Sequence, residues 1–220
     1  MFKINHLVIF VMCQLLLLSC GSQKDKTITW KIDSTEKIGE NSIIILGSPK
    51  VLVSEGKKMV EFLGENDGLL VNKNPLEGMK EFTIEVDLKP YDGYPENREQ
   101  RFLHIQDPSN ENRRILMELR LNSKNEWYGD WFMKTEYNGN GLALIDSTLT
   151  HPINVWATMS LVYKDEEMKG YINGKWQGAG VVNYLPIGEN GKTSIGTRMN
   201  KISWFKGTIR EVRFIPRAIY

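Results

Sequence analysis

The chain is poor in cysteine and histidine, and this scarcity excludes several kinds of site. Its two cysteines, Cys13 and Cys20, both lie within the first twenty residues. A domain formed by the rest of the chain therefore has no thiol for a disulfide, a cysteine zinc site or a cysteine nucleophile. Only three histidines are present, so we expect no transition-metal site and no other cofactor.

Neither sign of charge predominates. Lys and Arg number 28 and Asp and Glu number 27, which gives a formal net charge of +1 at pH 7. Removal of residues 1–19 removes one lysine and no acidic residue, so the two counts become equal. Proteins that bind nucleic acid neutralise its phosphates with a basic excess. The balance of charge therefore argues against a nucleic-acid partner.

The first 19 residues have the composition of a secretory signal peptide. Lys3 precedes an apolar run over residues 7–18, which is too short to span a bilayer as a permanent helix. The segment LLSC that ends at Cys20 resembles the lipobox of bacterial lipoproteins. This resemblance implies cleavage before Cys20 and acylation of its thiol. The alternative is a plain secreted protein with an incidental cysteine.

The lipobox resemblance also predicts the layout and location of the mature protein. Two acyl chains, each contributing about 0.8 kcal/mol per buried methylene, give stable anchoring without a spanning helix. We expect residues 20–29 to form the lipidated cysteine and a flexible polar tether, and residues 30–220 to form one domain. Gly21 stands where some inner-membrane lipoproteins carry an aspartate, which favours the outer membrane or cell surface.

Beyond residue 30, hydrophobic and polar residues alternate in several short runs. Residues 82–88 and 157–163 follow this period of two, which is typical of strands with one buried face. Asn173 and Gly174 lie between two further runs and favour the positive φ angles of a type I′ hairpin turn. Eight or more short strands without helices predict an all-β fold, either a two-sheet sandwich or a closed barrel.

Five segments occur in an order that resembles a known family: FTIEV, WATMSLVY, GYINGK, SIGTR and FKGTIREVR. Over about residues 58–216 this succession is similar to the laminin G-like modules of the concanavalin A-like lectin and glucanase superfamily. The resemblance implies a jelly-roll sandwich of two antiparallel sheets, with ligands on the concave face or at its rim. It does not imply one chemistry, because the superfamily includes lectins, glycosidases, polysaccharide lyases and adhesion modules.

Two of the predicted strands carry polar residues at alternate positions, which places them on one face of each strand. The segment FLHIQ carries His104 and Gln106 on one face, and the segment LMELRL carries Glu118 and Arg120. If the two strands pair, these four side chains form one polar patch. A binding or catalytic site on that face is the functional hypothesis, and an ion pair on a solvated sheet is the structural alternative.

Two neighbouring segments extend this patch. The segment WYGDWFMK places Asp130 and Lys134 on one side and two tryptophans, Trp127 and Trp131, on the other. A loop over residues 196–207 supplies three further candidates at the rim of the sheet: Arg198, Asn200 and Trp204. The tryptophans either contact a ligand or belong to the core.

This mixture of side chains suits a sugar. Aromatic rings cover the apolar side of a pyranose, while charged and amide groups hydrogen-bond its hydroxyls. Arginines favour a carboxylate-bearing or sulfated glycan because the guanidinium fork matches planar oxyanions. We therefore predict non-catalytic binding of a polysaccharide or glycan at the cell surface, with a protein-binding adhesion module as an alternative.

Catalysis on a polysaccharide is the other alternative. Glu118 and Asp130 are the candidate carboxyl pair for a glycosidase, but the E-x-D-x-x-E motif of laminarinase-type relatives is absent. A lyase would use His104, Glu118 and Arg120. Their segments are similar to the Q-x-H and R-x-E-x-R strands of jelly-roll alginate lyases, but the first motif is reversed and Leu116 replaces the leading arginine of the second.

Two remaining features are interpreted as structural. His151 precedes a proline in a turn, where a histidine is more often a hydrogen-bond donor than a base. The segment ENDG over residues 65–68 offers oxygen atoms of the kind that hold calcium in some laminin G-like modules. It also matches an ordinary turn, and we do not assign calcium to it.

Overall fold

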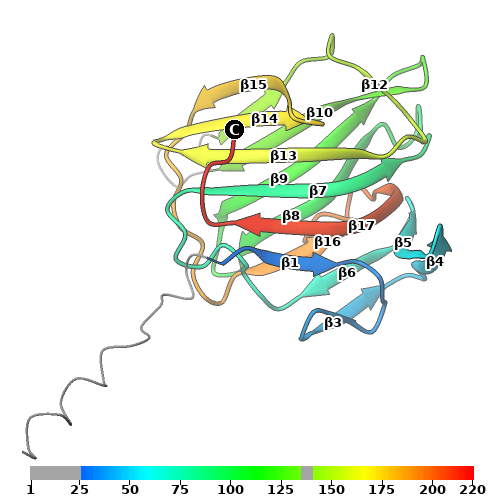
Figure 1. Cartoon of the computed structure of the whole chain (residues 1–220), viewed down its shortest axis with the longest axis horizontal. Coiled ribbons are helices and arrows are strands. Elements are labelled where there is room, and N and C mark those ends of the chain that lie inside the picture. The colour runs from blue at the N-terminus through cyan, green and yellow to red at the C-terminus, as the bar shows by residue number, and fades with distance from the viewer. Residues whose placement is uncertain (1–25, 135–140) are drawn as a thin grey trace, which may run out of the picture.

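The structure is a computed structural model that describes residues 26–134 and 141–220. These residues form 17 strands and no helix, which confirms the all-β prediction. The strands make two antiparallel sheets stacked as a sandwich (Figure 1). The predicted signal peptide and Cys20 lie outside the described residues. In the described ranges, no helix has the length and hydropathy needed to cross a membrane.

Sheet 1 contains the first and the last strand of the described chain. Its order is β15 (Lys175–Val181), β14 (Glu167–Ile172), β13 (Ala157–Lys164), β7 (Phe82–Pro90), β17 (Lys206–Ile215), β5 (Lys57–Leu63) and β4 (Lys50–Ser54), with β1 (Ile28–Lys31) also paired to β17.

Sheet 2 packs behind sheet 1 in Figure 1. Its order is β11 (Gly141–Ile145), β10 (Glu126–Lys134), β9 (Asn110–Leu121), β8 (Glu99–Asp107), β16 (Lys192–Ile195), β6 (Gly68–Val71), β3 (Asn41–Leu46) and β2 (Lys37–Ile38), with β12 (His151–Pro152) also paired to β10.

The strands with the clearest alternation form as predicted. The run predicted over residues 82–88 lies in β7, and the run over 157–163 lies in β13; the two strands pair side by side. The hairpin between β14 and β15 turns at Asn173 (φ 51°) and Gly174 (φ 72°). These angles confirm the predicted positive-φ turn.

The core fills the space between the two sheets. Phe205 packs against Phe62 and Phe102, with ring centroids 6.1 and 5.9 Å apart. Trp131 of β10 lies directly over Gly170 of β14, where a Cβ atom would come within 2.7 Å of the indole. Because Trp127 is also fully buried, these two tryptophans hold the sheets together and leave the polar face of β10 to other residues.

Candidate functional site

A row of charged side chains crosses the outer face of sheet 2. Asp130 of β10 lies opposite Glu118 of β9, which lies opposite Arg101 of β8. Residues directly opposite each other in neighbouring antiparallel strands point to the same side of the sheet. The pairing of β8 with β9 therefore places His104, Gln106, Glu118 and Arg120 on one face, as the alternation predicted.

Ion pairs link this row into a network. Nε of Arg101 lies 3.0 Å from Oε2 of Glu118. Arg120 contacts two acids at once: its Nε lies 2.9 Å from Oδ2 of Asp130 and its Nη1 lies 2.7 Å from Oε1 of Glu99. The side chains of Glu118 and Asp130 are only 7% and 4% exposed, so these acids depend on the arginines for their charge balance.

The network forms the floor of a hollow of about 280 Å³, which we call the arginine pocket. Its lining combines four arginines, two acids and three apolar side chains: Arg101, Arg114, Arg120, Arg198, Glu118, Asp130, Leu116, Phe132 and Ala143. Arginines therefore outnumber acids by two. No carboxylate of the described residues forms an ion pair with Arg114 or Arg198.

Arg114 is held at the pocket by two contacts, neither of which is an ion pair with a carboxylate. Its Nη1 donates to the carbonyl oxygen of Glu111 at 2.8 Å, and its guanidinium lies 5.3 Å from the ring centroid of Phe132. Its Nε is buried and has no hydrogen-bond partner. Burial, followed by repulsion from Arg198, lowers the pKa of Arg114, which indicates that the two cations lie close to each other.

Burial also changes the acidity of the two carboxyls. It raises the pKa of Glu118 to about 7; repulsion from Asp130 adds to this rise, and attraction to Arg101 opposes it. It raises the pKa of Asp130 as well, although the hydrogen bond from Arg120 opposes the change. Near neutral pH, therefore, a single proton on Glu118 alters the charge of the pocket.

His104 supports the site from beneath its surface. The ring is fully buried, and its Nδ1 accepts the backbone N–H of Met199 at 2.9 Å. Burial, with repulsion from Arg198, Arg114 and Arg101, lowers its pKa to about 3. His104 therefore positions the loop that carries Arg198 and does not line the pocket, which leaves it poorly placed to act as a base.

Three other predicted residues lie near the pocket without lining it. Gln106 of β8 lies opposite Arg114 and is half-buried. Lys134, at the end of β10, also lies opposite Arg114 on the other side of β9. Asn200 is exposed in the loop that follows Arg198. None of the three is among the residues that line the arginine pocket.

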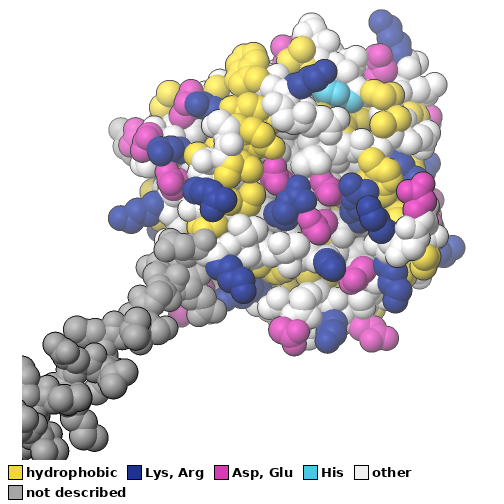
Figure 2. Space-filling model, in the orientation of Figure 1, with side chains coloured by type: hydrophobic (Ala, Val, Ile, Leu, Met, Phe, Trp, Pro, Cys, Tyr) yellow, Lys and Arg dark blue, Asp and Glu magenta, His cyan; other side chains and the backbone are white. Residues whose placement is uncertain are grey.

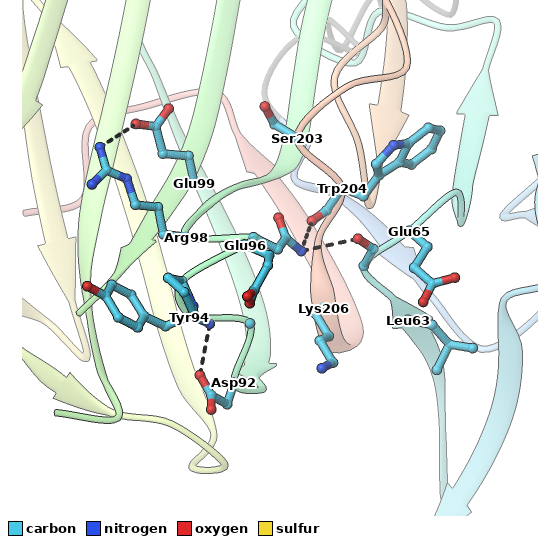
Figure 3. A pocket seen from close by; sticks show the side chains of 14 residues that line it. Leu63, Glu65, Asp92, Tyr94, Glu96, Arg98, Glu99, Ser203, Trp204 and Lys206 are labelled. Carbon is cyan, nitrogen blue, oxygen red and sulfur yellow. Dashed lines mark hydrogen bonds and ion pairs between the residues drawn. The ribbon is translucent and has the colours of Figure 1, made fainter. Parts of the chain in front are cut away.

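Trp204 belongs to a second hollow, which we call the loop pocket. It has a volume of about 750 Å³ and is lined by residues 63–65, 92–99, 203–204 and 206. Figure 3 shows Tyr94 and Trp204 on opposite sides of this hollow. The amide of Asn97 bridges two of these loops, donating to the carbonyl oxygens of Gly64 at 3.2 Å and Trp204 at 2.9 Å.

The two pockets are neighbours that share a wall. Arg101 of the arginine pocket donates to the hydroxyl of Ser203 in the loop pocket. Glu99, which lines the loop pocket, forms the ion pair with Arg120. The two hollows therefore lie next to each other along this side of the sandwich.

Sequence reasoning missed five lining residues: Arg101, Arg114, Leu116, Phe132 and Ala143. A bulge between Arg101 and Leu103 adds one residue to β8, so strict alternation from His104 assigns Arg101 to the wrong face. Arg114 and Phe132 continue the alternate sets of Glu118 and Asp130, and extension of those sets by two or four residues identifies them.

Asp67 and His151, which were considered for other roles, have structural partners; His151 lies in β12 and not in the predicted turn. Asp67 accepts the backbone N–H groups of Ser48 and Leu63, both at 2.8 Å, which fits the interpretation of residues 65–68 as a turn. Nε2 of His151 lies 3.2 Å from Oε1 of Gln177. Within the described residues, no group of His, Cys, Asp and Glu side chains has the arrangement of a metal site.

Comparisons with known proteins agree with the two-sheet fold. The family model for the concanavalin A-like lectin/glucanases superfamily (Laminin_G_3) matches residues 63–219. Among curated proteins, none matches the chain significantly. Domain 4 of AbnA, an extracellular arabinanase of Geobacillus stearothermophilus solved with arabinotriose, superposes with a TM-score of 0.62 at 14% identity, covering 87% of this chain and 92% of that domain.

Two other solved structures share the architecture. The binding domain of botulinum neurotoxin DC, solved in complex with SialylT, gives a TM-score of 0.61 at 13% identity over 90% of this chain and 49% of that one. The SAP-like pentraxin of Limulus polyphemus gives 0.53 at 12% identity, covering 90% and 79%. The chain thus spans about half the length of the toxin binding domain. At these identities the likeness establishes the fold.

Proposed function

The chain belongs to the concanavalin A-like lectin/glucanase superfamily, and from this premise we propose that it binds an acidic polysaccharide or glycan at the arginine pocket. One observation carries the proposal: Arg114 and Arg198 face the same hollow without a carboxylate partner among the described residues. Two uncompensated guanidinium groups are costly unless water or an anion solvates them. A ligand carboxylate or sulfate supplies that anion.

The shape of the pocket favours one sugar residue. Its volume of about 280 Å³ lies just below the roughly 300–1,000 Å³ that is usual for ligand sites. Phe132, Leu116 and Ala143 give it an apolar wall against which the carbon-bound hydrogens of a pyranose pack. The guanidinium groups then bind the charged substituent with paired hydrogen bonds.

The loop pocket offers room for the rest of the chain. Trp204 and Tyr94 supply aromatic surface, and Glu65, Asp92 and Glu96 supply hydrogen-bond acceptors for hydroxyl groups. Each such bond replaces one already made with water, so the affinity per sugar residue stays modest. The ligands in the arabinanase domain and the toxin domain support a carbohydrate-binding use of this fold.

The proposal is tested by comparing acidic oligosaccharides with their uncharged counterparts. Calorimetric titrations use trigalacturonate beside galactotriose, sialyllactose beside lactose, and a sulfated beside an unsulfated disaccharide. The acidic member of at least one pair binds, and more weakly at high salt because the contact is ionic. Arg198→Ala and Arg114→Ala each weaken that binding by about tenfold or more, since a hydrogen bond to a charged group contributes about 1.5–3 kcal/mol.

Arg217→Ala serves as the matched control. Arg217 is exposed and engages its neighbours through its backbone carbonyl oxygen, which accepts from Thr83. Its removal changes the net charge by the same amount without altering the pocket, so binding stays unchanged. Equal loss in Arg217→Ala and Arg198→Ala, or equal affinity for acidic and uncharged sugars, contradicts the proposal.

Polysaccharide cleavage is a second candidate, favoured by one observation. Glu118 has a pKa of about 7 and lies directly opposite Asp130, and a glycosidase needs a protonated acid beside a second carboxyl group. Both acids are tied to arginines, which fits a binding site equally well. Release of reducing ends, or of unsaturated products absorbing in the ultraviolet, that stops in Glu118→Gln would establish an enzyme.

We also propose that the domain is lipid-anchored at the outer membrane or cell surface through Cys20. The signal-peptide composition and the LLSC segment support this proposal. Two acyl chains give stable attachment without a spanning helix. Mass spectrometry of the N-terminal peptide then shows an acylated Cys20, and Cys20→Ser releases the protein from the membrane fraction. An unmodified Cys20 in a membrane-free protein would contradict the anchor.

A further inference from the structure

The outer face of sheet 1, on the opposite side of the sandwich from the arginine pocket, carries a band of aromatic side chains. Trp176 of β15 lies directly opposite Tyr171 of β14, so the two side chains point to the same side of the sheet. Tyr220 stacks on Tyr171 with ring centroids 4.6 Å apart and planes at 27°. Figure 2 shows a continuous hydrophobic band over this part of the face.

Trp176 has no structural partner that accounts for its position. Its side chain is 60% exposed, and no ring contact, cation–π contact or side-chain hydrogen bond involves it within the described residues. By contrast Trp30, Trp127 and Trp131 are buried. An indole exposed at the second position of β15 leaves a large apolar surface available to a ligand.

Tyr220 is fixed in place although it is 46% exposed. Its hydroxyl donates to Oε1 of Glu85 at 2.8 Å, and Glu85 is held in turn by Nε of Arg213 at 2.9 Å. The preceding backbone N–H, of Ile219, donates to the hydroxyl of Thr83 at 3.3 Å. The ring is therefore oriented before any ligand arrives, which lowers the entropy cost of binding.

The charges beside the band are already compensated. Arg213 contacts Glu85 at 2.9 Å and Glu211 at 2.6 Å, and Lys169 contacts Glu167 at 2.8 Å. Arg213 and Lys169 therefore have carboxylate partners, in contrast to Arg114 and Arg198 of the arginine pocket. The surface therefore suits an uncharged partner with a flat apolar face.

We propose that Trp176, Tyr171 and Tyr220 form a second binding site for an uncharged polysaccharide chain, whose pyranose rings lie along the aromatic band. The band is only a few side chains wide, whereas a stable protein interface buries about 800 Å² on each partner. A linear glycan presents a narrow row of apolar ring faces of matching shape. This inference is independent of the function proposed for the arginine pocket.

The test uses uncharged β-1,4-linked hexasaccharides of glucose, xylose and mannose as probes. Binding is followed by calorimetry and by the change in tryptophan fluorescence. At least one probe binds, and Trp176→Ala weakens that binding by about tenfold, the equivalent of about 1.4 kcal/mol. Tyr220→Ala weakens it in the same direction. Binding of acidic oligosaccharides stays unchanged in Trp176→Ala, because that site lies on the other sheet.

Val181→Ala is the matched control. Val181 lies on the same strand and is 79% exposed, but it lies opposite Glu167 and outside the aromatic row. Its loss leaves the binding of uncharged sugars unchanged. Failure of all three probes to bind, or an equal loss in Val181→Ala, overturns the proposal. So does concentration-dependent dimerisation in sedimentation equilibrium that Trp176→Ala abolishes, because the band would then be a self-association surface.

Discussion

Glu118 and Arg101 form a buried ion pair in which Oε2 of the acid lies 3.0 Å from Nε of the guanidinium. Even with this partner, burial raises the pKa of Glu118 to about 7. The pair therefore exists in two charge states near neutral pH. When Glu118 takes up a proton, the arginines of the pocket lose one of the three acids that form ion pairs with them.

Affinity for an acidic sugar is therefore expected to rise as the pH falls from 8 to 6. The uronate stays ionised over this range while Glu118 becomes neutral, which removes a repulsion worth roughly 1 kcal/mol, or about fivefold in affinity. His104, with a pKa of about 3, does not titrate there. Calorimetry at pH 6, 7 and 8 measures the change, and Glu118→Gln abolishes it. A variant with the pH profile of the wild type would rule out Glu118 as the cause.

Arg120 is expected to stabilise the fold through Asp130. The acid is 4% exposed and Arg120 is 26% exposed, so Arg120→Gln leaves a buried carboxylate without its partner. Loss of a fully buried partner costs about 3–5 kcal/mol, and the partial exposure of Arg120 reduces this to about 2 kcal/mol. Urea unfolding followed by tryptophan fluorescence measures the loss. Adding Asp130→Asn recovers part of it, and a double variant no more stable than Arg120→Gln would argue against this cause.

The contact between Trp131 and Gly170 predicts a pair of glycine substitutions with different outcomes. A Cβ on Gly170 would come within 2.7 Å of the indole, so Gly170→Ala forces the sheets apart and costs about 1–3 kcal/mol of unfolding free energy. Gly178 lies directly opposite on β15, and a Cβ there is 3.9 Å from Leu144. Gly178→Ala is therefore nearly neutral. Similar losses of unfolding free energy in both variants would show that the loss comes from the changed flexibility of the chain and not from a clash with the indole of Trp131.

The parts of the fold that depend on residues close together in the sequence were predicted correctly. The alternation in β7 and β13 and the Asn173-Gly174 turn depend on neighbours in sequence, and all three form as expected. The pairing of β8 with β9, which the sequence left as a condition for the polar patch, is present in the structure. In β8 the bulge at Phe102 broke the pattern, because an inserted residue shifts the phase of every side chain before it.

The details of the site depend on contacts between distant segments, which alternation does not reveal. His104 was expected on the polar face, and it lies there, but the loop that carries Met199 covers it. Trp204 was grouped with Arg198, yet the loop directs the two residues into different hollows. Long-range packing sets the path of a loop over a sheet. A single sequence therefore identifies the residues of the loop but does not predict where their side chains point.

The buried ring of His104 links stability to pH. Its pKa is about 3 in the folded protein, against an ordinary value of 6.5, so between these values the unfolded chain binds more protons than the native one. The stabilisation is therefore complete above pH 6.5 and is lost as the pH falls toward 3. Glu118 acts in the opposite sense, because its raised pKa favours the folded state below its ordinary value of 4.5 and disfavours it as the pH rises through 7.

His104→Asn separates the two effects. Asparagine retains an acceptor near the position of Nδ1 for the N–H of Met199 but does not titrate, so it replaces a pH-dependent contribution by a constant packing loss. Between pH 8 and pH 4 the unfolding free energy of the wild type is expected to fall by about 3 kcal/mol relative to the variant. Urea titrations at four pH values measure both curves. Parallel curves would mean that the folded protein protonates His104 at an ordinary pH, and thus that the loop over it opens readily.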